Sequence, residues 1–100
     1  MIINCFYDEN MEYADIVYIP DVIRVDVEIL YADFLKWIYD KCNNHKYWII
    51  FNGEKVACNY GTSAFVEWIN DNYMVQMMDK SYIIKKDSEM WDSRNRKLIF

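Results

Sequence analysis

The sequence predicts an α+β domain of the two-layer sandwich type, in which two helices cover one face of an antiparallel sheet of about five to seven strands. Three observations support this prediction: an internal repeat, a hairpin signal at Asn52-Gly53, and two segments whose apolar residues recur at helical spacing. The chain has 100 residues, of which 54% are hydrophobic, so we expect residues 1–100 to form a single domain around one core.

The repeat is seen when the chain is compared with itself at an offset of 31 residues. Segment 32–40 then lies over segment 63–71, and the two share Phe, Trp, Ile and a final Asp at equivalent positions. Each copy has the pattern strand, turn, strand, helix. We therefore expect a duplicated unit, with copies over about residues 16–42 and 47–73 that are related by a pseudo-twofold axis.

In the first copy, residues 23–29 alternate between apolar and charged side chains, a period of two that is typical of a half-buried strand. From Leu30 onward the apolar residues recur every three and four positions, which predicts a helix that ends at about Cys42. A second interpretation begins this helix earlier, with Asp26 as the N-cap and a hydrophobic staple between Val25 and Leu30. The repeat favours the strand.

The second copy carries the clearest local signals. Asn52-Gly53 stands between two strand-like segments, 47–51 and 54–59, and both residue types tolerate the positive φ of a type I′ turn, so a hairpin is expected. Gly61-Thr62-Ser63 supplies a break and an N-cap, which predicts a helix over residues 63–73.

Further strands are expected outside the two copies. Met1–Tyr7 is predicted to form an extra strand, and Tyr82–Lys86 is predicted to pair with Lys97–Phe100 in a closing hairpin around a polar connection. With the strands of both copies, these segments would complete the antiparallel sheet.

The sequence contains no cofactor-binding fingerprint and no metal-binding spacing, so we expect no cofactor, no metal ion and no enzymatic activity. The three cysteines, an odd number without a C-x-x-C pair, are expected to be free thiols in a reducing compartment. Two catalytic alternatives remain open: a nucleophile pair of Cys42 and His45, and a small hydrolase that uses clustered carboxylates such as Asp33 and Asp40.

The formal net charge of −5 is unevenly distributed, because residues 1–40 carry nine acidic and two basic side chains whereas residues 41–100 carry seven and nine. An acidic protein repels phosphate groups, so we expect no direct binding to nucleic acid. No apolar run approaches the ~20 residues that cross a bilayer, and the N-terminal residues do not resemble a signal peptide. A cytoplasmic protein that does not bind membranes is therefore expected, in a bacterium or a phage-infected host cell.

The abundance of aromatic residues and the acidic N-terminal part predict a non-enzymatic protein-binding domain. Small acidic inhibitors have this kind of composition, among them bacterial immunity proteins against toxins and phage anti-defence proteins of the anti-CRISPR kind, so the expected target has a basic surface. The alternative is a structural domain that forms a homodimer or belongs to a larger assembly. Tyr18 and Trp48 are expected on the sheet face that no helix covers. The residues expected to bind the partner are Asp8, Glu9, Glu12, Asp15, Asp21, Tyr18, Trp48, Met74, Met77 and Met78.

Overall fold

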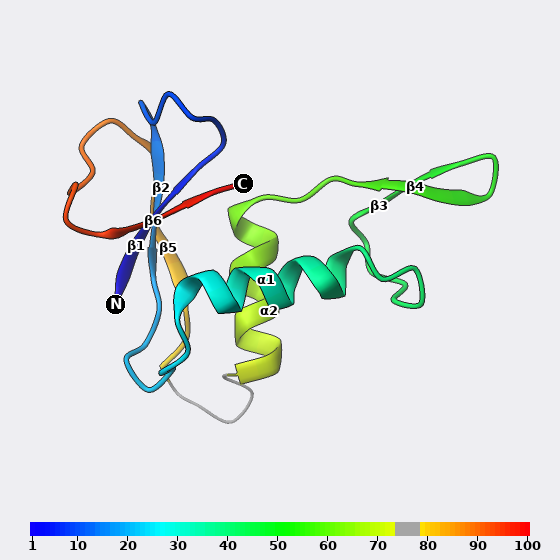
Figure 1. Ribbon diagram of the computed structural model, residues 1–100, viewed down its shortest axis with the longest axis horizontal. Coiled ribbons are helices and arrows are strands. Elements are labelled where there is room, and N and C mark those ends of the chain that lie inside the picture. The colour runs from blue at the N-terminus through cyan, green and yellow to red at the C-terminus, as the bar shows by residue number, and fades with distance from the viewer. Residues whose placement is uncertain (74–78) are drawn as a thin grey trace.

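The computed structural model describes residues 1–73 and 79–100 of the chain. In this part, four strands form a mixed sheet in the order β5-β2-β1-β6, and β3 and β4 form a separate two-stranded sheet. Figure 1 shows both helices beside the main sheet and the β3–β4 hairpin extending away from them. The elements are β1 (Ile2–Phe6), β2 (Ala14–Tyr18), α1 (Val27–Ile38), β3 (Trp48–Phe51), β4 (Glu54–Cys58), α2 (Thr62–Tyr73), β5 (Tyr82–Ser88) and β6 (Arg96–Ile99).

Strand β1 lies inside the four-stranded sheet and pairs with two neighbours. It runs antiparallel to β2, with Ile3 opposite Val17, and parallel to β6, with Cys5 opposite Leu98. Strand β5 pairs with the other side of β2. The α+β class is therefore confirmed, but the prediction of one antiparallel sheet of five to seven strands is wrong, because the main sheet is mixed and β3 and β4 remain separate from it.

Strands β5 and β6 do not form the predicted closing hairpin, because they lie at opposite edges of the sheet. The connection between them crosses the sheet face that the helices leave free. The ring of Trp91 packs there against Phe6, with the ring centroids 5.1 Å apart, and the Asn4 side chain donates a hydrogen bond to the carbonyl oxygen of Asp92 at 2.8 Å. These contacts hold the β5–β6 connection across the sheet, and β6 then pairs with β1 in the parallel direction.

Helix α1 begins at Val27 with Asp26 as its N-cap, in agreement with the second interpretation, and the predicted strand over residues 23–29 is wrong. The alternation of period two fails at Ile29, which a strand would bury but which is exposed. The helix also ends before the expected boundary near Cys42. Its buried residues follow the helical period and are Val27, Leu30, Phe34 and Ile38.

The predicted duplication is matched only in part. The hairpin and α2 occur where the second copy places them, and Asn52 and Gly53 adopt φ values of 51° and 77° in the turn. The first copy contains β2 and α1 but no second strand between them. The helices begin 35 residues apart, at Val27 and Thr62, so an offset of 31 residues does not superpose them.

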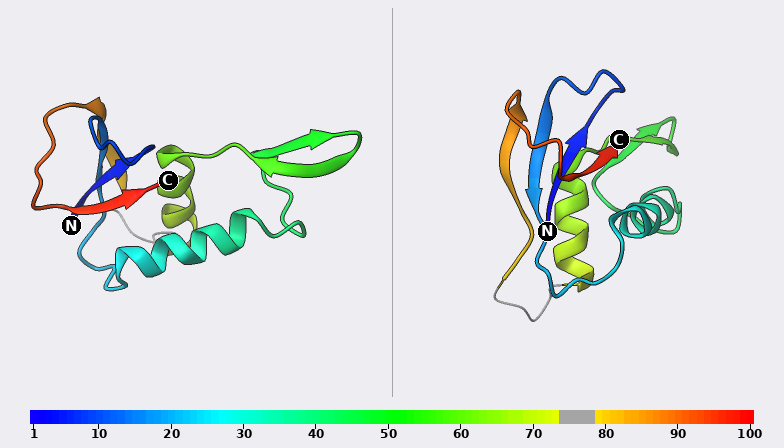
Figure 2. Two further views of the ribbon diagram at one scale, coloured as in Figure 1. Left: turned by 45° about the horizontal axis from the view of Figure 1, so that its top comes forward. Right: turned by 60° about the vertical axis from the view of Figure 1, so that its left-hand side comes forward.

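Both helices pack on one face of the four-stranded sheet, which gives two layers (Figure 2). Ile3 of β1 and Val17 of β2 are fully buried in the core between these layers. Phe34 of α1 contacts the rings of Phe65 and Trp68 of α2 at centroid distances of 5.4 and 5.7 Å, in edge-to-face arrangements. Aromatic packing therefore joins the two helices to each other.

The hydroxyl group of Tyr7 connects the sheet to the N-terminus of α2. It donates a hydrogen bond to Oδ2 of Asp15 at 2.9 Å and accepts one from the main-chain N–H of Thr62 at 3.0 Å. The Oγ1 atom of Thr62 lies 2.9 Å from the same hydroxyl oxygen. Glycine fits position 61 without displacing this hydroxyl group, whereas a Cβ atom there would lie only 2.8 Å from the Tyr7 hydroxyl oxygen.

Replacement of Gly61 with alanine is expected to displace the Tyr7 hydroxyl group and to lower the free energy of unfolding by about 1–3 kcal/mol. Urea denaturation measures this difference. In a Tyr7→Phe background the hydroxyl oxygen is absent, so the same substitution should cost clearly less there. An equal cost in both backgrounds would show that the hydroxyl contact is not the reason for the glycine.

Candidate binding surfaces

The connection between β1 and β2 presents acidic side chains to the solvent. Asp8, Glu9 and Glu12 are exposed in this loop. Oδ1 of Asp8 accepts a hydrogen bond from the main-chain N–H of Asn10 at 2.9 Å, and Met11 has a φ of 53°, so the loop turns tightly. Within residues 1–73 and 79–100, none of the three carboxylates takes part in an ion pair.

The connection after β5 adds to this acidic loop. The indole N–H of Trp91 donates to the carbonyl oxygen of Glu12 at 3.4 Å and holds the two connections together. The negative charge of Glu89 and its hydrogen bond to Tyr13, followed by the charge of Glu12, raise the pKa of Tyr13. Tyr13 is 50% exposed and Met90 is 87% exposed. No local sequence pattern links Glu89 and Met90 to the loop. We call Asp8, Glu9, Glu12, Tyr13, Glu89 and Met90 the acidic surface.

Asp15 and Asp21 do not belong to the acidic surface. Asp15 is 4% exposed, and its carboxylate accepts hydrogen bonds from the Tyr7 hydroxyl and, at 3.0 Å, from the main-chain N–H of Asp87. It therefore supports the irregular pairing of β2 with β5, where the regular ladder is interrupted. Asp21 is exposed and forms an ion pair with the amino group of Met1 at 2.7 Å.

Tyr18 lies on the sheet face opposite the helices. Its partners across the sheet are Ile2 and Tyr82, which are both partly exposed to solvent. The Tyr18 hydroxyl donates to Oδ2 of Asp79 at 2.9 Å, and the rings of Tyr18 and Tyr82 lie 5.2 Å apart. This face is thus partly apolar, but the connection that contains Trp91 covers another part of it.

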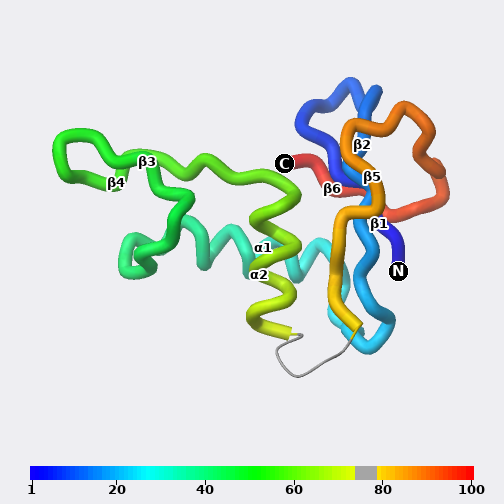
Figure 3. Tube along the Cα trace, turned by 180° about the vertical axis from the view of Figure 1, so that it is seen from behind, coloured from blue at the N-terminus to red at the C-terminus, as the bar shows by residue number. Residues whose placement is uncertain are grey.

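The β3–β4 hairpin, residues 48–58, extends from the helices as an arm (Figures 1 and 3). Trp48 stands in this arm, so the expectation that it shares a sheet face with Tyr18 is wrong. Exposure is highest near the turn, where Phe51 is 67% exposed. A typical hairpin with one polar and one buried face would hide such side chains. The exposed large apolar residues of the arm are Ile49, Ile50, Phe51 and Val56.

His45 fixes the base of the arm. Its ring stacks on Trp48 with a centroid distance of 5.1 Å and an interplanar angle of 6°. Nδ1 of His45 accepts a hydrogen bond from the main-chain N–H of Tyr47 at 3.2 Å, and Nε2 lies 2.8 Å from the carbonyl oxygen of Ile38. These partners assign the neutral form with the proton on Nε2. The arrangement does not favour a nucleophile pair with Cys42, because both imidazole nitrogens are bonded to the main chain.

The side chains of Lys55 and Trp48 also attach the arm to the connection that precedes it. The ammonium group of Lys55 lies 5.5 Å from the Trp48 ring and donates hydrogen bonds to the carbonyl oxygens of Lys41 and Asn43. The indole N–H of Trp48 also donates to the carbonyl oxygen of Asn43, at 2.6 Å. Trp48 is therefore half-buried and engaged in contacts within its own chain, whereas the apolar residues closer to the turn are exposed.

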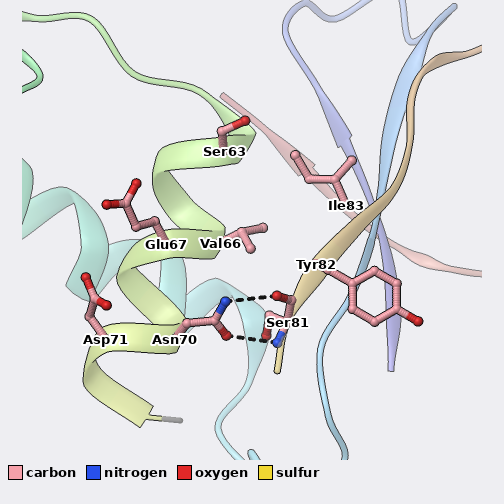
Figure 4. Close-up of a pocket in the computed structure, with 8 residues that line it drawn as sticks. All are labelled: Ser63, Val66, Glu67, Asn70, Asp71, Ser81, Tyr82 and Ile83. Atoms are coloured by element: carbon pink, nitrogen blue, oxygen red, sulfur yellow. Dashed lines mark hydrogen bonds between the residues drawn. The ribbon is translucent and has the colours of Figure 1, made fainter. Parts of the chain in front are cut away.

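A groove of about 460 Å³ lies between α2 and β5 (Figure 4). Asn70 bridges its two walls: Nδ2 donates to the carbonyl oxygen of Ser81 at 2.9 Å, and Oδ1 accepts the Ser81 main-chain N–H at 2.8 Å. Glu67 in the same groove accepts hydrogen bonds from the Tyr47 hydroxyl at 2.8 Å and from Lys46 at 3.3 Å, which lower the pKa of Glu67. Glu67 therefore connects the groove to Lys46 and Tyr47, the residues that directly precede the arm.

Asn70→Ala is expected to lower the free energy of unfolding by about 1–3 kcal/mol, because it removes two hydrogen bonds to main-chain groups of Ser81. Chemical denaturation measures the change. Asn72→Ala is the matched control, since Asn72 makes one local hydrogen bond to the carbonyl oxygen of Trp68 within α2. If the free energy of unfolding falls equally in both variants, the hydrogen bonds from Asn70 to Ser81 stabilise the fold no more than a local hydrogen bond does.

The three cysteines are free thiols in different surroundings: Cys5 is buried, Cys42 is exposed and Cys58 is half-buried. Burial, and secondarily the negative charge of Asp15, raises the pKa of Cys5 to about 12. Burial also raises the pKa of Cys58. Because the thiolate is the reactive form, the three thiols should differ strongly in reactivity.

With a disulfide reagent at pH 8, we expect Cys42 to react first, Cys58 more slowly, and Cys5 only after denaturation. Counting the released chromophore over time gives the number of thiols in each phase. Cys42→Ser should remove the fast phase and leave the others unchanged. Fast modification of Cys5 in the native protein would contradict its burial between the sheet and the helices.

Three partner-binding candidates, Met74, Met77 and Met78, lie outside the described residues. Within residues 1–73 and 79–100, no group of three His, Cys, Asp or Glu side chains is close enough to hold a metal ion. In the same part of the chain, neither helix is long and apolar enough to cross a membrane.

No protein-family model matches this chain, and no match was found among curated proteins or solved structures. The acidic surface and the arm are the features of the described residues that bear most directly on function.

Proposed function

We propose that the chain is a non-enzymatic protein-binding domain that inhibits a partner with a basic surface. The acidic surface supports this proposal most directly, because the exposed carboxylates of Asp8, Glu9 and Glu12 share one loop with Tyr13 and adjoin Met90. Negative charge speeds association with a basic partner, while aromatic and methionine side chains supply contact area that excludes water.

A suitable target is a protein that handles nucleic acid, or a toxin. Such proteins bind phosphate groups through basic grooves, and an acidic protein of net charge −5 would compete for the same groove. Inhibition would then follow from steric and electrostatic occupation of the groove, without chemistry. The proposed role corresponds to that of an immunity protein, or of a phage anti-defence protein of the anti-CRISPR kind, in the cytoplasm of a bacterium or an infected host cell.

The exposed arm favours a second role, that of a structural domain that forms a homodimer. The two roles are compatible, because the acidic surface and the arm lie on well-separated parts of the molecule (Figures 1 and 3).

The double charge reversal Glu9→Lys with Glu12→Lys is expected to reduce capture of the target at low salt by about tenfold or more. Tagged protein is incubated with lysate of a bacterial host, and the retained proteins are identified by mass spectrometry after washes at low and high salt. The unmodified chain should retain a basic nucleic-acid-handling protein or a toxin, and should lose part of it at high salt because salt screens exposed charges.

The matched control is Asp33→Lys with Asp71→Lys, which changes the net charge by the same amount on α1 and α2 and should preserve capture. Equal loss in both double variants would contradict a role for the acidic surface in particular. The activity of the captured protein is then assayed with and without the chain, and unchanged activity in the complex would contradict inhibition.

A further inference from the structure

Strand β3 forms one outer edge of the arm, and this edge lacks the features that usually prevent pairing with another strand. A hairpin of two strands is marginally stable in water by itself. Within residues 1–73 and 79–100, each strand of the arm has a single hydrogen-bonded neighbour, which leaves both outer edges open to another strand. Natural proteins protect such edges with charged side chains, prolines or bulges. The protection of β3 therefore decides whether it can accept a partner.

The other edge strands among the described residues are protected, whereas β3 is not. Strand β5 carries Lys85 and Lys86, and β6 carries Arg96 and Lys97. Strand β4 begins with Glu54-Lys55 and is irregular at Val56, which is the extra residue opposite Ile49 and Ile50. Strand β3 has the sequence Trp-Ile-Ile-Phe, without a charge, a proline or an extra residue.

The direction of the main-chain groups identifies Ile50 as the centre of this edge. Phe51 and Glu54 flank a two-residue turn and therefore form a hydrogen-bonded pair. Residues along a strand alternate in the direction of their N–H and C=O groups, so those of Ile50 point away from β4. They are available to a strand that approaches from outside.

From this edge we propose that β3 pairs antiparallel with β3 of a second copy, across a twofold axis, so that the two arms form one four-stranded sheet in the order β4-β3-β3-β4. Identical strands related by a twofold axis place like residues near each other. In β5 or β6 such pairing would oppose lysine or arginine side chains, which is destabilising, whereas β3 brings no charge to the contact.

The distribution of charge also favours contact through the arms. The arm contains one acidic and one basic residue, Glu54 and Lys55, and is neutral, although the whole chain carries a net charge of −5. Two copies that meet through their arms keep their acidic surfaces apart, since the arm extends away from the β1–β2 loop (Figure 1). Contact through the β1–β2 loops would instead bring like charges together.

The area available sets the strength of this contact. The exposed apolar side chains of the arm present on the order of 400 Å², as much as the largest apolar patch of a typical monomer. Two arms with their paired main chains would bury on the order of 1,000 Å², which lies at the lower end for specific interfaces. The dimer is therefore reversible, and its population depends on protein concentration.

Sedimentation velocity over a wide range of concentration tests the proposal with a matched pair of variants, Ile50→Lys and Val56→Lys. Both residues are 55% exposed in the arm, and both substitutions add one positive charge. The unmodified chain should shift from monomer to dimer as concentration rises. Ile50→Lys should raise the dissociation constant at least about tenfold, whereas Val56→Lys, on the protected strand, should change it only about threefold or less.

Amide hydrogen exchange supplies a second measurement that does not depend on a substitution. The N–H of Ile50 should exchange more slowly as the protein concentration rises, because it is protected only in the dimer. Circular dichroism confirms that both variants are folded. A monomer at all concentrations, or equal weakening by both variants, would overturn pairing through β3; the second result would indicate contact through the flat face of the hairpin. The inhibitor proposal can fail independently, since the acidic surface is unchanged in both variants.

Discussion

The hydroxyl group of Tyr7 joins the sheet to helix α2, and both candidate surfaces take their position from this contact. The acidic loop begins directly after β1, at the point where Tyr7 is held by Asp15. On the other side of the contact, Thr62 starts α2 immediately after the segment that leads out of the arm. One hydroxyl group satisfies a buried carboxylate and an N–H at a helix N-terminus at the same time. Gly61 leaves room for this arrangement, because a Cβ atom at position 61 would lie only 2.8 Å from the hydroxyl oxygen and would displace it.

The elements that the sequence predicts correctly are those specified by local chemistry. Asn52-Gly53 requires positive φ values and fixes the hairpin, and the apolar spacing after Gly61 fixes α2. The predicted strand over residues 23–29 is wrong because the apolar residues there fit both the strand period of two and the helical period. Val27 and Leu30 can face the same core only on a helix, since residues three apart in a strand point to opposite faces. The order of the strands depends instead on contacts between distant residues, such as Trp91 with Phe6, and no local pattern specifies these contacts.

The surfaces are predictable to a similar degree. The composition of the β1–β2 loop indicates an acidic region, but Glu89 and Met90 join it only through the folded connection after β5. Asp15 carries the same charge as Asp8, Glu9 and Glu12 but is buried, and its hydrogen bonds offset the cost of that burial. A signal for the arm is present in the sequence, since β3 has four consecutive apolar residues and no polar face. Such a run is typical of a strand covered on both faces, whereas in this structure its residues near the turn are exposed.

The two proposals are linked through charge. Each copy carries a net charge of −5, so association of two copies is opposed by a long-range repulsion that the neutral arms reduce but do not remove. A basic target bound to the acidic surface would neutralise part of this charge and would thereby favour pairing of the arms. Thermodynamic linkage then requires the reverse effect, in which pairing of the arms increases the affinity for the target by the same factor. A paired molecule would also present two acidic surfaces to a target with repeated basic sites, and its avidity would exceed the affinity of one surface without any additional type of contact. A weak dimer is sufficient for this purpose, because the target itself supplies the remaining free energy of association.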